Sequence, residues 1–181
     1  MKPADEEIGA VPTRTLVIGG ARSGKSRNAE ALALRTGLEP VYVATATAWD
    51  AEMEARIARH RAERAGAGWH TVEAPLALVE VLRREAVPGR VLLVDCLTLW
   101  LSNVMLGGHD TEREASTLVA ALPDLAAPIF FVSNEVGWGI VPDHKLGRDF
   151  RDAQGLLNQA MARACDRVLL VAAGLPLVLK G

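Results

Sequence analysis

An octapeptide near the N-terminus has the residue types and spacing of a phosphate-binding loop. It follows the pattern GxxxxGK[ST] and comprises Gly19, Gly20, Ala21, Arg22, Ser23, Gly24, Lys25 and Ser26. Glycines let the backbone curl until successive N–H groups converge on phosphate oxygens, and the following helix adds partial positive charge. A strand-like run precedes the loop and a helical pattern follows it, which favours this interpretation over a chance glycine-rich turn. The loop predicts a nucleotide site in which Lys25 reaches the β- and γ-phosphates and Ser26 holds Mg²⁺.

A carboxylate at the end of a buried strand is the second candidate group. Asp95 follows the four apolar residues 91–94, and strand ends of this kind face the ligand crevice of an open α/β sheet. An acid after a hydrophobic run is common, and by default it is a surface residue. In a chain that also carries a phosphate loop, Asp95 is expected to hold Mg²⁺ directly or through water.

The segment from about residue 50 to residue 63 is predicted to be an amphipathic helix with a histidine on its inner face. Met53, Ile57, His60 and Arg64 fall on one stripe at helical spacing. On spacing alone, a partly buried structural histidine is the favoured interpretation of His60. An imidazole is nonetheless substantially neutral and nucleophilic at pH 7, as a phosphoramidate intermediate requires.

Two other classes of phosphate-loop protein are compatible with the loop itself. A switch GTPase needs a DxxG element and an NKxD element, but Cys96-Leu97-Thr98 follows Asp95, and residues 134–137 lack the Lys and the Asp. The GTPase interpretation is therefore poor. A monofunctional small-molecule kinase of the same fold fits the chain length better and stays the main alternative.

Short β-branched runs alternate with helical patterns along the chain, which predicts how these groups are brought together. Strands are expected at residues 15–19, 40–45, 91–95, 129–133 and 167–171, with a last short strand at 177–179. Runs of four or five apolar residues are typical of a sheet buried on both sides. The prediction is an α/β fold of the P-loop NTPase (RecA-like) class: a mostly parallel sheet flanked by helices, with a C-terminal antiparallel hairpin. Residues 14–181 are expected to form one nucleotide-binding domain after a flexible tail at residues 1–13.

A long two-faced helix is expected from about residue 144 to residue 165. Its buried stripe is predicted to comprise Leu146, Phe150, Ala153, Leu157, Met161 and Ala164. Its polar face is predicted to carry Arg148, Arg151, Asp152, Gly155, Asn158 and Gln159. Gly155 costs about 1 kcal/mol in mid-helix relative to alanine, which suggests a close approach there. The preceding loop, residues 137–142, is either a ligand-contacting loop or a turn around a packed tryptophan.

Composition excludes several functions. The 181 residues are half hydrophobic, and the net charge of −2 comes without a basic patch, which argues against nucleic-acid binding. The longest apolar run near the C-terminus, residues 168–179, is too short to span a bilayer, and the polar N-terminus has no signal core. Cys96 and Cys165 lack the spacing of a zinc site and are predicted to be small buried hydrophobes. A cytoplasmic enzyme without membrane insertion is expected.

Several strings of residues together resemble one enzyme family. They are the phosphate loop with Arg27-Asn28-Ala29-Glu30, Tyr42-Val43-Ala44-Thr45, Glu52-Met53 with Arg56-Ile57 and His60, Trp69-His70-Thr71-Val72-Glu73, Asp95-Cys96-Leu97-Thr98-Leu99-Trp100, Ser133-Asn134-Glu135-Val136-Gly137-Trp138-Gly139-Ile140-Val141-Pro142, Arg148-Asp149-Phe150-Arg151-Asp152 with Gly155 and Asn158-Gln159, and Gly174 with Leu179-Lys180. From residue 14 to residue 181 the chain resembles the bifunctional adenosylcobinamide kinase/adenosylcobinamide-phosphate guanylyltransferases of cobalamin biosynthesis.

The resemblance implies two reactions on one chain. ATP or GTP phosphorylates the aminopropanol hydroxyl of adenosylcobinamide. GMP then passes from GTP through a guanylylated histidine to the new phosphate, which gives adenosylcobinamide-GDP and pyrophosphate. Many members have two adjacent histidines where this chain has Arg59-His60, and the nucleophile maps onto His60.

The same mapping implies which residues line the guanine nucleotide. They are Ala44, Thr45, Ala46, Arg61, Ala62, Glu63, Arg64, Glu73 and Asp95. The resemblance also implies a corrinoid substrate, for which the polar face of the helix at 144–165 is a candidate surface, and a homotrimeric assembly.

Overall fold

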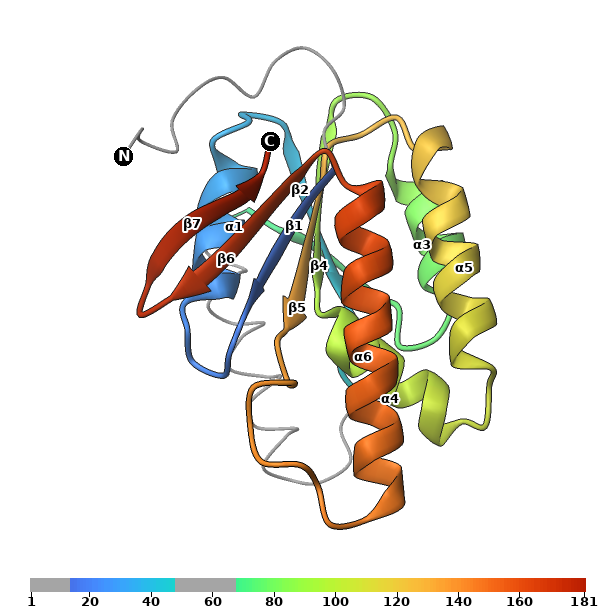
Figure 1. The fold of residues 1–181 in the computed structure, drawn as a ribbon. Coiled ribbons are helices and arrows are strands. Elements are labelled where there is room, and N and C mark those ends of the chain that lie inside the picture. Colours follow the sequence, from blue (N-terminus) through green and yellow to red (C-terminus); the bar gives the residue numbers. More distant parts are fainter. Residues whose placement is uncertain (1–13, 48–67) are drawn as a thin grey trace.

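The computed structural model describes residues 14–47 and 68–181 (Figure 1). Seven strands form one sheet in the order β3-β2-β4-β5-β1-β6-β7. Their bounds are β1 Arg14–Gly19, β2 Glu39–Ala44, β3 His70–Glu73, β4 Arg90–Asp95, β5 Ile129–Asn134, β6 Arg167–Ala172 and β7 Leu175–Lys180. Strands β1 to β6 are parallel to one another, and β7 pairs antiparallel with β6. The predicted fold class, a mostly parallel sheet with a C-terminal antiparallel hairpin, is confirmed.

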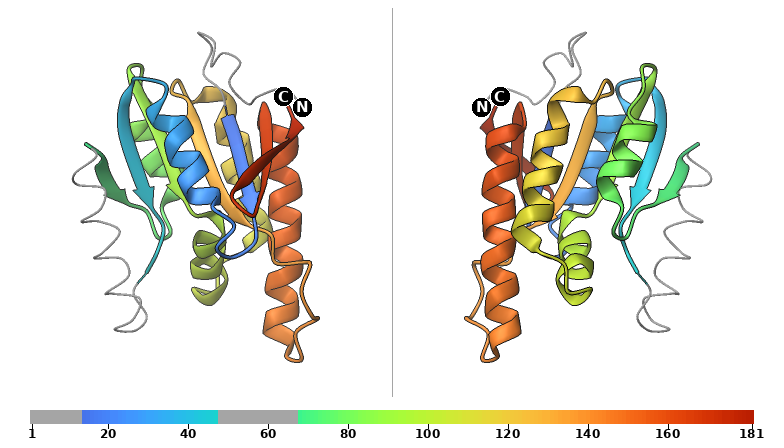
Figure 2. Two further views of the ribbon diagram at one scale, coloured as in Figure 1. Left: turned by 90° about the vertical axis from the view of Figure 1, so that its left-hand side faces the viewer. Right: turned by 90° about the vertical axis from the view of Figure 1, so that its right-hand side faces the viewer.

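Helices cover both faces of the sheet (Figure 2). Helix α1 lies on one face, and α3, α4, α5 and α6 lie on the other (Figure 1). Their bounds are α1 Lys25–Leu34, α3 Leu78–Glu85, α4 Leu97–Leu106, α5 Thr111–Ala121 and α6 Lys145–Ala164, with a 3-10 turn at Leu122–Asp124. No helix among the described residues is long and apolar enough to cross a membrane.

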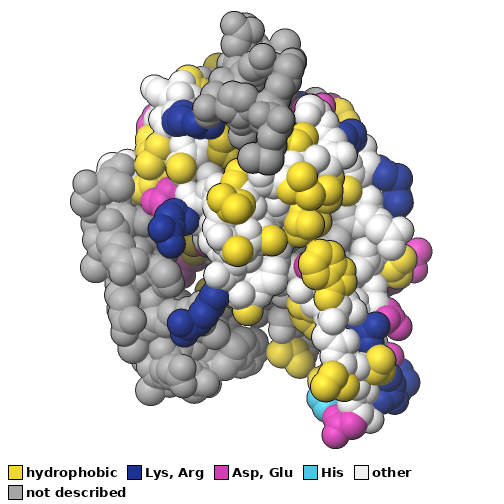
Figure 3. All heavy atoms as spheres, turned by 60° about the vertical axis from the view of Figure 1, so that its left-hand side comes forward, with side chains coloured by type: hydrophobic (Ala, Val, Ile, Leu, Met, Phe, Trp, Pro, Cys, Tyr) yellow, Lys and Arg dark blue, Asp and Glu magenta, His cyan; other side chains and the backbone are white. Residues whose placement is uncertain are grey.

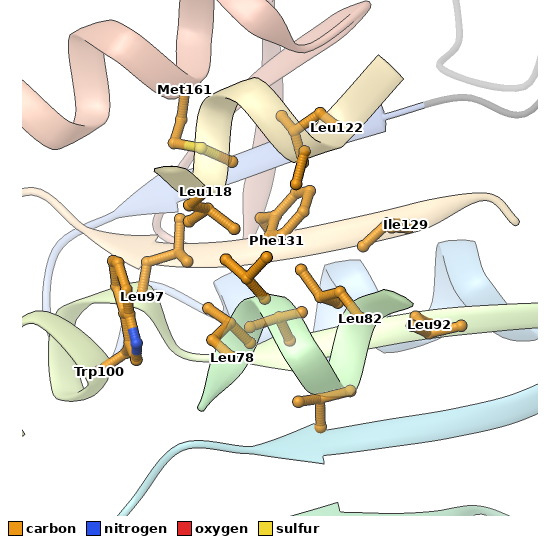
Figure 4. Close-up of a cluster of buried hydrophobic side chains, with 14 of the residues drawn as sticks. Leu78, Leu82, Leu92, Leu97, Trp100, Leu118, Leu122, Ile129, Phe131 and Met161 are labelled. Atoms are coloured by element: carbon orange, nitrogen blue, oxygen red, sulfur yellow. The ribbon is translucent and has the colours of Figure 1, made fainter. Parts of the chain in front are cut away.

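Each face of the sheet has its own hydrophobic core. The larger core joins the four-helix face to the sheet and contains Trp100, Phe131 and Met161 (Figure 4). The smaller core lies between α1 and the sheet and includes Leu32, Leu93 and Val132. Burial on both faces explains why the central strands consist of consecutive apolar residues.

Alternation along β4 and β5 determines where their last side chains lie. Leu92 and Val94 belong to the larger core, whereas Val91 and Leu93 belong to the α1 core. Because successive side chains point to opposite faces of a strand, Asp95 falls on the α1 face. The same alternation in β5 puts Asn134 on the α1 face and Ser133 on the α6 face.

The sequence-based strands and the long helix agree with the structure, with the exception of one strand. The predicted strands match to within a few residues, but β3 was not predicted, because this four-residue edge strand lacks a buried apolar run. The predicted helix at 144–165 is confirmed as α6, with His144 as its N-cap: the Gly147 N–H donates to the imidazole Nδ1 at 3.0 Å.

Two predicted positions on α6 are wrong. Leu146 was placed in the buried stripe but is exposed, because the first turns of α6 extend beyond the end of the sheet (Figure 2). Asn158 is predicted to lie on the polar face, opposite the buried stripe, but it is buried, and Ser133 of β5 is its hydrogen-bond partner. At Gly155, a Cβ would meet no described atom within 4 Å, so no close approach within the described chain accounts for this glycine.

Candidate functional site

The phosphate loop joins β1 to α1 in the conformation that its glycines permit. Strand β1 ends at Gly19, and Gly24 caps α1 with a left-handed φ of 92°. The Lys25 ammonium folds back over the loop and donates to the Gly20 carbonyl at 3.1 Å. Lys25 is only 9% exposed, so its charge is held at the loop. A curled backbone, a helix N-terminus and a fixed ammonium together form an anion site.

Gly19 is required by close packing beneath the loop. A Cβ at Gly19 would lie 2.5 Å from the Val171 carbonyl oxygen of β6 and 2.6 Å from Ser23 Oγ. The Ser23 hydroxyl is itself buried, and it has no hydrogen-bond partner within the described part of the chain. Any side chain at Gly19 would therefore force the loop away from β6.

The turn between β6 and β7 is hydrogen-bonded to the same loop. The Gly174 N–H donates to the Ser23 carbonyl at 2.8 Å. The Asn28 side chain of α1 donates from Nδ2 to the carbonyls of Gly24, at 3.1 Å, and Gly174, at 3.3 Å. Ala173, in this turn, has a left-handed φ of 52°, which is uncommon for a residue other than glycine. These hydrogen bonds were not predicted from the sequence, although Gly174 and Asn28 belong to the strings that resemble the enzyme family.

Asp95 lies at the carboxyl end of β4, as predicted. The Tyr42 hydroxyl of β2 donates to Asp95 Oδ2 at 2.9 Å, which orients the carboxylate. Strand register places Ala44 level with Asp95 on one side and with Glu73 on the other. Three predicted nucleotide-lining residues from three strands therefore share one row at this edge of the sheet. Glu73 is exposed and Ala44 is half-buried.

Thr45 supports this edge from inside the protein. Its side chain is fully buried, and its Oγ1 donates to the Cys96 carbonyl and accepts from the Cys96 N–H, both at 2.7 Å. Asn103 of α4 donates to the Thr45 carbonyl at 2.8 Å. The Thr45 hydroxyl is thus used to hold the backbone after Asp95, and the half-buried Ala44 and Ala46 are the more accessible members of the predicted triplet.

Cys96, beside Asp95, is kept as a neutral thiol. Burial, with a smaller effect from the Asp95 carboxylate, raises the pKa of the Cys96 thiol to about 11. Burial also raises the pKa of Cys165 to about 12. Neither cysteine is poised as a nucleophile, because the thiolate is the reactive form. The expectation of two small buried residues is confirmed.

The loop after β5 projects apolar side chains into solvent. Trp138 is 77% exposed and Ile140 is 97% exposed. The alternative of a turn around a packed tryptophan is therefore wrong. The loop is held at both ends: Glu135 Oε1 accepts from the Gly137 N–H at 2.7 Å, and Arg148 donates to the Pro142 and Asp143 carbonyls.

Five of the predicted site residues lie outside the described residues. They are His60, Arg61, Ala62, Glu63 and Arg64, together with the predicted helix at residues 50–63 that carries them. At the carboxyl ends of the parallel strands, the structure therefore contains the phosphate loop, Ala44, Thr45, Ala46, Glu73 and Asp95.

Comparison with known proteins relates this chain to one family. A family model described as cobinamide kinase / cobinamide phosphate guanyltransferase matches residues 15–179. The bifunctional adenosylcobalamin biosynthesis protein CobP of Pseudomonas aeruginosa is 54% identical over 172 residues, covering 93% of this chain and 98% of its own length. The corresponding CobU protein of Escherichia coli K12 is 39% identical over 180 residues, covering 91% of this chain and 98% of its own length.

Solved structures at low sequence identity share the fold. A protein from Pyrococcus horikoshii OT3 aligns with a TM-score of 0.54 at 11% identity and covers 94% of this chain and 87% of its own length. At this identity the likeness concerns the arrangement of strands and helices alone.

Proposed function

Because the chain belongs to the cobinamide kinase / cobinamide phosphate guanyltransferase family, we propose that it performs both transfers on adenosylcobinamide. The first is phosphorylation of the aminopropanol hydroxyl by ATP or GTP. The second is transfer of GMP from GTP to the new phosphate. The observation that carries the proposal is one sheet edge with a complete phosphate loop and Asp95, in a chain 54% identical to a bifunctional relative.

In the kinase step, the phosphate loop holds the nucleotide while the substrate hydroxyl attacks. The backbone N–H groups of residues 20–26 and the Lys25 ammonium bind the β- and γ-phosphate oxygens. The hydroxyl oxygen bonds to the γ-phosphorus, the bond from that phosphorus to the β-γ bridging oxygen breaks, and the nucleoside diphosphate leaves. The hydroxyl proton passes to solvent or a base. Fixed donors that meet the transferred group need no reorganisation during transfer, which lowers the barrier.

In the guanylyl step, the attack shifts to the α-phosphorus. The His60 imidazole nitrogen bonds to the α-phosphorus, and pyrophosphate leaves with the β- and γ-phosphates. Lys25 and the loop stabilise that leaving group, so one loop serves both steps. The phosphate of the corrinoid then attacks the guanylyl phosphorus, the phosphorus–nitrogen bond breaks, and the free imidazole is restored. In this proposal, residues 14–181 form one domain. The guanine nucleotide is lined by Ala44, Ala46, Glu73 and residues 61–64.

Ser26 and Asp95 fit a Mg²⁺ ion bound together with a nucleotide. Ser26 lies in the first turn of α1, and Asp95 ends β4 on the face that α1 covers. The described residues contain no group of three or more His, Cys, Asp or Glu that could hold a metal by themselves. One hydroxyl and one carboxylate suit Mg²⁺, which usually binds one or two protein oxygens with phosphates and water. When bound, the ion neutralises charge on the phosphates.

The products of two incubations, one with ATP and one with GTP, test the proposal against a monofunctional kinase. With adenosylcobinamide and ATP, the protein should form adenosylcobinamide phosphate, detected by mass. With GTP it should form adenosylcobinamide-GDP and release pyrophosphate. Formation of the phosphate alone under both conditions would support the monofunctional kinase, and formation of neither product would contradict the proposal.

We further propose that the protein works in the cytoplasm, where ATP and GTP are available, as a homotrimer like that which the family resemblance implies. The β6–β7 hairpin supports an assembly, because Leu175, Leu177 and Leu179 of β7 are exposed, and hydrophobic side chains gather on this face of the molecule (Figure 3). Light scattering after gel filtration should give three times the 19.3 kDa chain mass. A monomeric mass at working concentration would contradict the assembly.

A further inference from the structure

Asn134, the last residue of β5, lies between the phosphate loop and Asp95 in the order of the strands. Strand β5 is flanked by β1, which leads into the phosphate loop, and by β4, which ends at Asp95 (Figure 1). Register pairs Asn134 with Gly19, whereas Asp95 is level with Val132. Asn134 therefore reaches two residues beyond Asp95 at the carboxyl edge, on the face where α1 and the phosphate loop lie.

Buried side chains hold the backbone of Asn134 on both sides. The Thr98 hydroxyl of α4 accepts from the Asn134 N–H at 2.8 Å, and Asn158 of α6 donates from Nδ2 to the Asn134 carbonyl at 3.0 Å. Thr98 and Asn158 are each only 7% exposed. The next residue is also fixed, since the Glu135 N–H donates to the Gly19 carbonyl at 3.1 Å. The end of β5 is thereby tied to the start of the phosphate loop.

Asn158 is itself held in place by a buried polar network. Its Oδ1 accepts from the Ser133 hydroxyl at 2.7 Å and from Gln154 Nε2 at 3.0 Å. Gln154 Nε2 also donates to the Ser133 hydroxyl at 2.9 Å. Buried networks with several mutual bonds fix one arrangement of their members. The position of the Asn134 backbone is therefore determined by α4, α6 and β1 together.

The Asn134 side chain contrasts with this fully bonded backbone. The carboxamides of Asn28, Asn103 and Asn158 all donate hydrogen bonds to described residues. Asn134 is half-buried, and its carboxamide has no hydrogen-bond partner among the described residues. A carboxamide is neutral and offers two N–H donors, so it can bind a phosphate oxygen without the repulsion that a carboxylate would cause.

We propose that Asn134 is a catalytic residue whose Nδ2 donates a hydrogen bond to a non-bridging oxygen of the γ-phosphate. The inference rests on the proposed function and names a contact within the same site. In the kinase step the γ-phosphate is the transferred group, and in the guanylyl step it belongs to the pyrophosphate that leaves. The Asn134 donor therefore stabilises developing charge in both steps, as preorganised donors do at comparable sites.

Nucleotide binding without any corrinoid tests the contact. Dissociation constants for GDP and for the β,γ-imido analogue of GTP, both with Mg²⁺, should be measured for the wild type, Asn134→Ala and Asn134→Asp. We expect Asn134→Ala to weaken the triphosphate analogue by about tenfold, the effect of losing one hydrogen bond to a charged group. Its affinity for GDP, which lacks the γ-phosphate, should be unchanged. Asn134→Asp, which keeps the shape and adds a negative charge, should weaken the triphosphate analogue further.

Other outcomes would overturn the proposal. Equal loss of GDP and triphosphate binding, or a loss of thermal stability in Asn134→Ala, would assign Asn134 a structural role. Unchanged binding of both nucleotides would remove the γ-phosphate contact. If the wild type makes no phosphorylated adenosylcobinamide, the proposed function fails, but the binding comparison still decides the role of Asn134.

Discussion

Lys25 is the side chain on which both proposed transfers depend most directly. Its ammonium is held over the loop by the Gly20 carbonyl. We expect Lys25→Ala to lower the rates of phosphorylation and guanylyl transfer by at least about 100-fold, since a fixed donor to the reacting phosphates is lost. The melting temperature should change little. Steady-state assays of both steps check this, and more than a tenth of the wild-type kinase rate in the variant would count against a shared loop.

Glu85 at the end of α3 is predicted to make stability depend on pH. Arg84 donates to its Oε1 at 2.8 Å and Arg90 to its Oε2 at 2.7 Å. Mainly because of the Arg84 hydrogen bond, the pKa of the Glu85 carboxyl lies below its usual value. A carboxylate of this kind stabilises the fold above its unfolded-state pKa, and that contribution is lost as the pH falls through the folded-state pKa.

Glu85→Gln should therefore lower the free energy of unfolding by about 1–2 kcal/mol at neutral pH. The difference from the wild type should shrink as the pH falls through the acid range and should vanish once the carboxyl is protonated. Urea unfolding across that range measures it, with the exposed Glu80 of the same helix as the control for Glu→Gln substitution. A difference that stays constant with pH would mean that packing, not charge, is the contribution of Glu85.

Among the elements, those with strong periodicity were predictable and those fixed by distant partners were not. The apolar runs of β1, β4, β5 and β6 and the two-faced pattern of α6 mark these elements in the sequence. Strand β3 forms because the edge of β2 offers it a partner, which no local pattern reveals. The burial of Asn158 likewise depends on Ser133, twenty-five positions earlier in the chain.

The Lys180 side chain connects the C-terminal hairpin to α6 through hydrogen bonds. The Lys180 ammonium at the end of β7 donates to the carbonyls of Ala162, Arg163 and Cys165, at 3.1, 3.0 and 2.5 Å. It thus caps the C-terminus of α6, where the helix dipole favours a cation. We expect Lys180→Met to lower the free energy of unfolding by about 1 kcal/mol. Chemical denaturation measures the change.

Lys145→Met is the matched control for that change. Lys145 pairs with Asp149 on the surface of α6, where its side chain is 81% exposed, so its loss should alter stability very little. Equal effects of the two substitutions would show that Lys180 acts as an ordinary surface charge and not as a helix cap.

At the scale of the whole molecule, the motifs of the candidate site are recognisable in the sequence, whereas the strand order that brings them together is not. The phosphate loop and Asp95 are recognisable because each follows a strand within a short string of residues. The common row of Glu73, Ala44 and Asp95 depends on the strand order β3-β2-β4, which brings together segments far apart in the chain. The hydrogen bond from Gly174 to the phosphate loop likewise joins segments far apart in the chain. The register between distant strands, unlike a motif, is set only when those strands pair.

The measurement that tests the central claim most directly is labelling of the protein by GTP without a corrinoid. With Mg²⁺, GTP labelled at the α-phosphate should leave label on the denatured wild-type protein, whereas GTP labelled at the γ-phosphate should leave none. The bond should survive alkali and break in mild acid, as a phosphoramidate does. His60→Asn should abolish the label and guanylyl transfer while phosphorylation of adenosylcobinamide persists, because γ-transfer needs the loop and not the imidazole. Undiminished α-labelling of His60→Asn, or parallel loss of both activities with a lower melting temperature, would contradict the account.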